Sequence, residues 1–216
     1  MIGALLYISS GTRLDISYSV NYLSRFQNCY NETHYKYALR VLKYLYLTKD
    51  LKLKFKRNDK VDILECYVDA DWAGDCNDRK STTGYIIKLF GNVIHWKSRK
   101  QGSVTKSSTA AEYVALSEAV SEVILLKDLL SDFKVEIKKP VNIYEDNSGA
   151  VSIAKFGNFT KRSKYIEVHY HFVNENYVNG LIDIVKVCTE KNVADILTKA
   201  LGRVRFEKLR ELLNLM

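Results

Sequence analysis

Apolar positions near the start of the chain recur every three to four residues, which is the period of a helix with one buried face. This pattern predicts helices at residues 5–8, 16–26 and 33–47. The third helix would bury Ala38, Leu42 and Leu45 on one face. Beyond residue 49 apolar residues alternate with lysines, and Asn58-Asp59 is a turn signal, so we expect the helical segment to end there.

The rest of the chain switches between strand-like and helix-like patterns. Apolar and β-branched runs predict strands at 63–68, 84–90, 93–96, 141–144 and 182–187. The second and third strands would form a hairpin around Gly91-Asn92. Helical spacing predicts a long helix that carries Ala115, Ala119, Val123, Leu126, Leu130 and Phe133, and further helices at 148–156, 165–177, 193–201 and 206–215. This order of elements is typical of a mixed sheet covered by helices.

Charge and cysteine content narrow the class of partner and the setting. The 216 residues carry a formal net charge of +8, which suits a polyanionic partner such as nucleic acid. The four cysteines form no Cys-x-x-Cys pair, which argues against a zinc site or a disulfide framework and favours a reducing setting, the cytosol or the nucleus. Residues 1–10 make a poor signal peptide and no apolar run could cross a bilayer, so we expect no membrane partner.

Four acidic residues lie where predicted strands end or predicted helices begin. Asp69 ends the first strand and Asp146 follows the strand at 141–144. Glu112 falls in the first turn of the long helix, and Asp195 falls in the short helix near the end of the chain. Ligands gather at such strand ends in open α/β sheets. Four carboxylates converging there would bind a hard cation, chiefly Mg²⁺, and would suit phosphodiester cleavage by two metal ions.

Each of these acids also has a purely structural interpretation. With 25 acidic residues in the chain, a few near element ends can arise by chance. Thr109 and Glu112 have the spacing of a capping box, in which Glu112 bonds back to the start of its helix. Asp146 could cap the next helix, and Asp195 could simply stabilise a helix dipole. Asp71 could be a solvated turn residue, so the spacing alone leaves both interpretations open.

Several motifs, taken in chain order, resemble the ribonuclease H domain of copia-type retrotransposon Pol polyproteins. These motifs are YVDADWAGD (67–75), RKSTTGY (79–85), WKSRKQ (96–101), SSTAAEY (107–113), Asp146-Asn147 with Ala150, and ADILTK (194–199). GALLY (3–7), TRLDI (12–16) and His34 with RVLKYL (40–45) resemble the connector between reverse transcriptase and ribonuclease H. The resemblance covers nearly the whole chain.

The resemblance implies an α/β fold with a ribonuclease H-like mixed five-stranded sheet, flanked by helices and preceded by a helical connector. It implies a connector at 1–58, a ribonuclease H-like domain at 59–202 and a C-terminal amphipathic helix at 203–216. The implied partners are an RNA/DNA hybrid and the reverse transcriptase portion of the same polyprotein. The implied location is a virus-like particle in the cytoplasm, with the nucleus as the alternative.

The resemblance also assigns roles to the acids. Asp69, Glu112, Asp146 and Asp195 would be the catalytic, metal-binding carboxylates, holding two Mg²⁺ ions with Mn²⁺ as a substitute. Asp71 falls where related ribonucleases H usually have a small residue, so it would not bind the metal itself but would support the residues that do. The implied reaction is hydrolysis of the RNA strand of an RNA/DNA hybrid, which leaves a 3′-hydroxyl and a 5′-phosphate.

Basic residues near these motifs are candidates for holding the nucleic acid. One group lies between the hairpin and the long helix, and a second follows the helix at 148–156. The candidates are Lys97, Arg99, Lys100, Lys106 and Arg162. Such residues hold phosphates without reading sequence. An ordinary solvated face explains the same charges equally well.

Departures from the family pattern keep other hypotheses open. Leu14 stands where the connector motif usually has proline, and the loop at 187–192 has no histidine, which leaves Glu190 or solvent for proton transfer and product release. An inactive or domesticated retrotransposon remnant, acting as a nucleic-acid-binding or scaffolding module, is therefore the alternative to a nuclease. An integrase of the same fold would have its glutamate last in the chain, whereas Glu112 comes second here.

Overall fold

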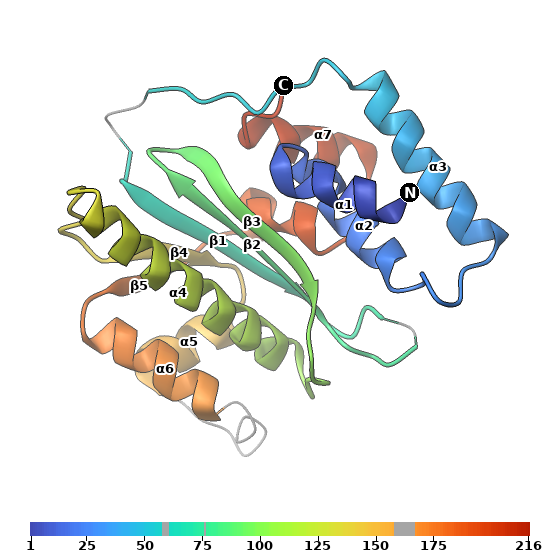
Figure 1. Ribbon diagram of the computed structural model, residues 1–216. Helices are drawn as coiled ribbons and strands as arrows, with labels where there is room; N and C mark the ends of the chain where they lie inside the picture. Colours follow the sequence, from blue (N-terminus) through green and yellow to red (C-terminus); the bar gives the residue numbers. More distant parts are fainter. Residues whose placement is uncertain (58–60, 76, 158–166) are drawn as a thin grey trace.

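A five-stranded sheet forms the centre of the molecule (Figure 1). The computed structural model describes residues 1–57, 61–75, 77–157 and 167–216, so the predicted turn at Asn58-Asp59 lies outside the described residues. The strands are β1 (Leu64–Asp71), β2 (Thr82–Leu89), β3 (Asn92–Lys100), β4 (Val141–Glu145) and β5 (Ile182–Lys186), in the spatial order β3-β2-β1-β4-β5. β1, β2 and β3 are antiparallel neighbours, whereas β4 and β5 run parallel to β1, so the predicted mixed sheet is confirmed.

One face of the sheet is covered by α4 (Ser108–Asp132), α5 (Ser148–Phe156) and α6 (Glu167–Val178) (Figure 1). Ala111, Ala115 and Ala119 of α4 are fully buried, and such small side chains let the helix lie close to the strands. The predicted apolar face of α4 holds as far as Leu130, but Phe133 is exposed because the helix ends at Asp132.

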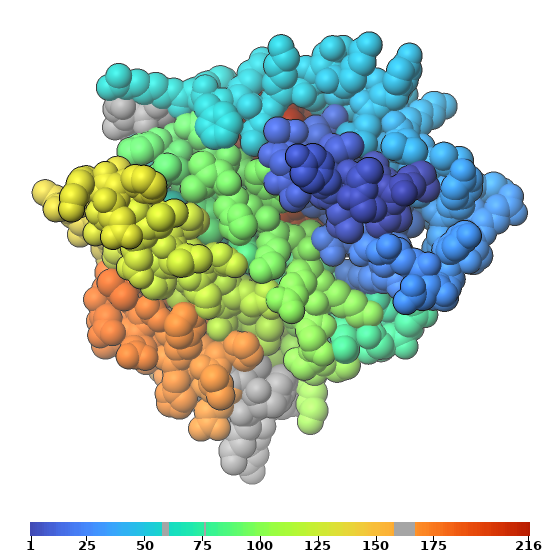
Figure 2. Space-filling model, viewed as in Figure 1, coloured from blue at the N-terminus to red at the C-terminus, as the bar shows by residue number. Residues whose placement is uncertain are grey.

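The opposite face is covered by the two ends of the chain. α1 (Ile2–Gly11), α2 (Ser17–Ser24), α3 (Glu32–Leu47) and the short 3-10 helix η1 (Leu14–Ile16) confirm the predicted helical start. After β5 come the 3-10 helices η3 (Thr189–Lys191) and η4 (Val193–Leu197), and then α7 (Arg203–Leu212). The ribbon and space-filling views both show α1 beside the hairpin formed by β2 and β3 (Figures 1 and 2). None of the helices in the described part of the chain combines the length and the apolar composition that a membrane span requires.

The N-terminal helices share a hydrophobic core with the sheet. Leu14 is fully buried in one cluster with Ile86 of β2 and Leu209 of α7. The indole N–H of Trp96 in β3 donates to the carbonyl of Ser9 in α1 at 2.9 Å. The connector and the sheet therefore pack on each other, while the division of the chain at residue 58 stays a prediction.

A buried ion pair gives the TRLDI motif a structural role. Arg13 donates from Nε and Nη2 to the two carboxylate oxygens of Asp15 at 3.0 and 2.8 Å. Arg13 also donates to the hydroxyl and carbonyl of Thr48 at the end of α3, and Tyr44 of α3 donates to Asp15 at 2.6 Å. Because a buried charge pair is stable only when its remaining hydrogen-bonding groups are satisfied, these contacts fix α3 against η1.

Two further local predictions are wrong. The hairpin turn consists of Phe90 and Gly91, whose φ angles of 50° and 75° are both positive, as a two-residue turn that follows the strand twist requires. Asn92 instead begins β3 and bonds the backbone N–H and carbonyl of Lys56. On α3 the buried face is formed by Ala38 and Val41, whereas Leu42 is exposed.

A buried acid ties the loop after β1 to the N-terminal helices. Asp75 accepts from Arg25 just after α2 at 3.1 Å, from Lys100 of β3 at 2.7 Å and from the backbone N–H of Asn77 at 2.9 Å. Burial opposes ionisation, but these donors outweigh it and lower the pKa of Asp75 to about 2. Because this pKa is depressed in the folded state, the carboxylate stabilises the fold above about pH 4, and that contribution is lost as the pH falls toward 2.

We predict that Asp75→Asn lowers the free energy of unfolding at pH 7 by about 2 kcal/mol and flattens its decline between about pH 4 and pH 2. Urea unfolding at a series of pH values measures both effects. Asp50→Asn, at an exposed position after α3, is the matched control and should change neither. An unaltered pH dependence in Asp75→Asn would contradict this role.

Candidate metal site

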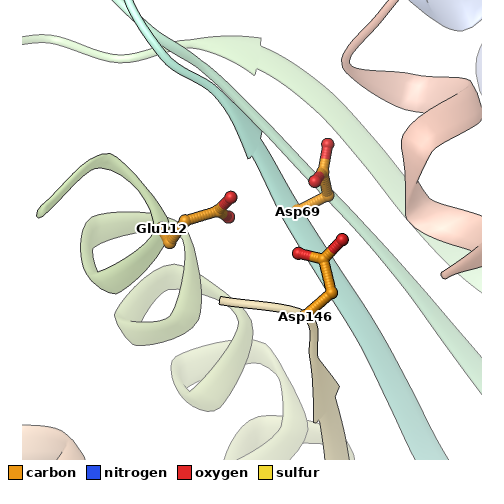
Figure 3. A group of neighbouring side chains, drawn as sticks. All are labelled: Asp69, Glu112 and Asp146. Atoms are coloured by element: carbon orange, nitrogen blue, oxygen red, sulfur yellow. The ribbon is translucent and has the colours of Figure 1, made fainter. Parts of the chain in front are cut away.

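Three carboxylates meet at one end of the sheet (Figure 3). Asp69 of β1, Glu112 of α4 and Asp146 directly after β4 each offer one oxygen, and these oxygens all lie within 4.8 Å of one another. Asp69 and Glu112 are buried, and Asp146 is half-buried. The structure therefore brings together three of the four acids that the sequence predicts.

The pairing of β1 with β4 places Asp69 beside Asp146. The two strands are parallel with Tyr67 opposite Tyr144, and these two rings stack with their centroids 4.6 Å apart. Side chains alternate between the faces of a sheet, so the residues two positions further along share the face of the two tyrosines. The strand register thus sets two of the three carboxylates side by side at the carboxyl ends of their strands.

Glu112 reaches the strand ends from the first turns of α4. Gln101, which follows β3, donates to the carbonyl of Ala111 at 2.9 Å and holds the start of the helix against the sheet. Gly149 of α5 lies so near Thr109 that a Cβ at position 149 would be 2.8 Å from the threonine Oγ1. A glycine at this position therefore lets α4 and α5 begin close together.

The caps of α4 and α5 show that Glu112 and Asp146 do not serve as capping residues of these helices. Ser107, not Thr109, caps α4 and accepts the backbone N–H of Ala110 at 3.2 Å, so the predicted capping box with Glu112 does not form. Asn147, not Asp146, caps α5 by accepting the backbone N–H of its third residue at 3.0 Å. The carboxylates of Glu112 and Asp146 point toward Asp69 instead (Figure 3).

Burial disfavours the ionised form of these carboxylates unless a positive charge lies nearby. It raises the pKa of Asp69 to about 6 although Lys199 opposes the rise, and it raises the pKa of Glu112 well above its ordinary value, with Glu145 adding to the effect. Oε2 of Glu112 is buried and has no hydrogen-bond partner among the described residues. Converging carboxylate oxygens, one of them unpaired, fit a hard divalent cation such as Mg²⁺.

A further carboxylate that no motif marks adjoins the cluster. Glu145 ends β4 and is fully buried. Its Oε1 accepts the backbone N–H of Asn147 at 2.8 Å, while Oε2 is without a partner in the described part of the chain, and burial raises its pKa well above the usual value. Val141 and Ile143 share its face of β4, so the alternation of this strand is the sequence signal that could have identified a buried acid at position 145.

Asp195, the fourth predicted acid, does not belong to the group of three. It lies in η4, where one carboxylate oxygen accepts from Lys199 at 2.8 Å and the other accepts from Arg205 of α7. Lys199 also donates to Asp69 at 3.0 Å. Asp195 therefore adjoins the cluster through a shared lysine. The helix predicted at 193–201 is shorter than expected, because η4 ends at Leu197.

The residues around η4 also orient Asp69. The hydroxyl of Thr198 donates to Asp69 Oδ2. Asn192 donates to the carbonyl of Val68 at 2.8 Å and so anchors the start of η4 on β1. Gly84 of β2 allows the close approach, because a Cβ at position 84 would lie 2.5 Å from Cγ2 of Thr198.

Asp71 lies two residues beyond Asp69 on the same face of β1, outside the group of three. Its carboxylate lies against Gly74, where an added Cβ would collide with it. Burial raises the pKa of Asp71, while Lys199 and Arg25 oppose the rise. This setting suits a supporting acid, and that role stays a prediction.

The predicted nucleic-acid-binding residues fall into different settings. Lys97 pairs with an acid of α4 at 3.6 Å, and Lys100 pairs with two acids of the loop after β1 at 2.7 and 2.9 Å. Arg99 and Lys106 are exposed. Arg162 lies outside the described residues. The closeness of these basic residues in the sequence therefore does not establish a continuous basic surface in the fold.

Comparison with known proteins decides the family. No protein-family model matches the chain. The chain is 39% identical over 207 residues to the retrovirus-related Pol polyprotein from transposon RE2 of Arabidopsis thaliana, a match that covers 96% of this chain and 14% of that polyprotein. It is 36% identical over 214 residues to the Pol polyprotein from transposon TNT 1-94 of Nicotiana tabacum, covering 99% of this chain and 16% of the relative. Over nearly its whole length, the chain is therefore homologous to part of the Pol polyproteins of copia-type retrotransposons.

The chain spans only a small part, 14% and 16%, of these two curated relatives. Its fold is that of ribonuclease H. The structure of LC11-RNase H1, isolated from compost by a metagenomic approach, matches with a TM-score of 0.51 at 21% identity and covers 68% of this chain and 98% of that one. Both the family and the fold that the motifs imply are thus confirmed.

We predict that Gly84→Ala lowers the free energy of unfolding by about 1–3 kcal/mol, because the added methyl group pushes η4 off the sheet. The displaced Thr198 should also release Asp69 and weaken the binding of Mn²⁺. Urea unfolding and Mn²⁺ titration measure the two effects. Gly102→Ala, where an added Cβ meets nothing within 4 Å, is the control. Wild-type stability and wild-type Mn²⁺ affinity in Gly84→Ala would show that the close approach is unimportant.

Proposed function

We propose that this chain is a metal-dependent endonuclease that hydrolyses the RNA strand of RNA/DNA hybrids during retrotransposon reverse transcription. The observation that carries the proposal is the convergence of Asp69, Glu112 and Asp146 at the end of a ribonuclease H-fold sheet. Membership of the Pol polyprotein family supports it, because reverse transcription produces the hybrids that such an enzyme would consume.

The three carboxylates would hold Mg²⁺, with Mn²⁺ as a substitute, and Asp195 would contribute to a second ion. A divalent cation bound there supplies Lewis acidity, which lowers the pKa of a water molecule and stabilises the leaving oxygen of the phosphodiester. Carboxylates suit this cation better than histidines or cysteines, because Mg²⁺ prefers oxygen ligands.

The other residues of the site would hold these ligands in place. Thr198 fixes one oxygen of Asp69. The strand register fixes Asp69 relative to Asp146, and α4 carries Glu112 on a rigid element. Ligands held in this way lose little side-chain freedom when a cation or a substrate binds, which favours catalysis. Burial of Asp69 and Glu112 limits the access of water and strengthens every electrostatic interaction in the site.

Selection of the hybrid would depend on duplex shape and on the 2′-hydroxyls that only the RNA strand offers. Arg99 near the end of β3 and Lys106 on the stretch between β3 and α4 are exposed, and both would contact backbone phosphates. Such contacts position a duplex without reading its sequence. Lys97 and Lys100 would first have to exchange their acidic partners for phosphates.

We further propose that the chain acts beside the reverse transcriptase portion of a Pol polyprotein, inside a cytoplasmic virus-like particle. The match to 14% of the RE2 polyprotein supports a role within a longer protein. The connector at 1–58 would lie between the two catalytic parts and pack on the ribonuclease H-like sheet through Leu14 and Trp96.

We predict that the purified chain, with Mg²⁺, cuts the labelled RNA strand of an RNA/DNA hybrid and leaves 3′-hydroxyl and 5′-phosphate ends. Asp146→Asn should lower the cleavage rate by roughly 10²- to 10³-fold or more, because it removes a charged ligand and keeps the shape of the side chain. Gel analysis of the labelled strand measures the rate, and hybrid binding should survive the substitution.

Asp128→Asn, at an exposed position of α4, is the matched control for this assay and should cleave at the wild-type rate. A DNA duplex of the same sequence should remain intact. A folded chain that binds the hybrid but cuts nothing in Mg²⁺ or Mn²⁺ would refute the nuclease and favour the non-cleaving remnant.

A further inference from the structure

Lys199 lies between two acids of the site. Its Nζ is 3.0 Å from Oδ1 of Asp69 and 2.8 Å from Oδ1 of Asp195. A lysine ammonium carries a full positive charge at neutral pH. A positive charge is therefore already bound where two of the four predicted ligands approach each other.

The remaining oxygens of these two acids also have partners. Oδ2 of Asp69 accepts from the hydroxyl of Thr198, and Oδ2 of Asp195 accepts from the guanidinium of Arg205. A divalent cation shared by Asp69 and Asp195 would have to displace Lys199, because like charges repel strongly at contact distance. Each carboxylate oxygen has a second lone pair, so Asp69 can still serve the group of three without that displacement.

We propose that Lys199 takes the place of a second divalent cation in the free protein. The chain then binds one ion, at Asp69, Glu112 and Asp146, and admits another between Asp69 and Asp195 only after Lys199 has left. This inference deepens the function proposed above and rests on it for the existence of the first metal site.

The position of Lys199 allows it to leave. Its side chain is 34% exposed and extends from the segment just after η4. A flexible four-carbon stem gives the ammonium group a wide reach. A backbone phosphate of the nucleic acid is a competing anionic partner for it. Binding of a hybrid would draw Lys199 away from Asp195 and make room for the second ion, which couples metal loading to substrate binding.

Counting the Mn²⁺ ions bound by the free protein tests this proposal. In a titration that follows unbound Mn²⁺ by electron paramagnetic resonance, the wild type should bind one ion per chain and Lys199→Met should bind two. Adding Asp195→Asn to Lys199→Met should return the count to one, because the second position then loses a ligand.

The controls for this count are Lys199→Arg, which keeps the charge, and Lys208→Met, which removes an exposed lysine of α7. Both should bind one ion. Two ions on the wild type, or a single ion on folded Lys199→Met, overturns the proposal. Because two ions on the wild type would overturn the proposal, the number of ions on the wild type tests it even where Lys199→Met does not fold.

A second readout needs no metal. In the presence of EDTA at pH 7, Lys199→Met should lower Tm by roughly 3 °C or more, because it leaves Asp69 and Asp195 buried without their shared cation. The double variant that also carries Asp195→Asn should regain part of this loss. A Tm in EDTA equal to that of the wild type would overturn the role of Lys199 as a resident counter-ion.

Hybrid cleavage separates a failure of this inference from a failure of the proposed function. Two ions on a wild type that cuts the hybrid would overturn the inference and leave the nuclease intact. One ion on the wild type and two on Lys199→Met, without any cleavage, would support the inference and refute the nuclease.

Discussion

The gathering of several carboxylates in one largely buried place is the constraint on which the rest of this structure depends. Asp69 and Glu112 are both buried, and they lie within reach of Asp146. Ionised carboxylates this close repel each other most where water is excluded, so the protein tolerates them in their charged form only beside positive charge. Lys199 supplies part of that charge in the free chain. The repulsion between these carboxylates and their proposed chemistry thus have one origin, which is that the carboxylates need a cation beside them.

Strand register and close backbone contacts hold these carboxylates in place. The parallel register of β1 and β4 aligns two of the acids, and glycines at 84 and 149 let η4 and α5 approach the sheet and α4 more closely than a Cβ would allow. The far face of the sheet is closed by the N-terminal helices, whose arrangement is fixed by the buried Arg13 and Asp15 pair. Because interiors are close-packed, a single added methyl group at such points displaces a whole element.

Periodicity alone predicts most of the fold, since the five strands and the main helices fall within a few residues of the expected positions. Local sequence patterns mispredict the structure where the outcome depends on tertiary contacts. The positive φ of Phe90 has no residue signal, and the cap at Ser107 competes with an equally plausible one at Thr109. The pairing of Asp195 with Arg205 requires α7 to dock beside η4. Strand ends mark Asp69 and Asp146 as candidates, whereas no sequence pattern marks the lysine that lies between Asp69 and Asp195.

The proposed function and the proposed role of Lys199 both depend on one divalent cation site, formed by side chains from β1, α4 and the end of β4. Anomalous diffraction from crystals of the free chain grown with Mn²⁺ tests it most directly, because it locates the ion without relying on activity. We expect a peak coordinated by Asp69, Glu112 and Asp146. A protein that binds Mn²⁺ in solution but shows no peak at these three carboxylates would contradict the assignment.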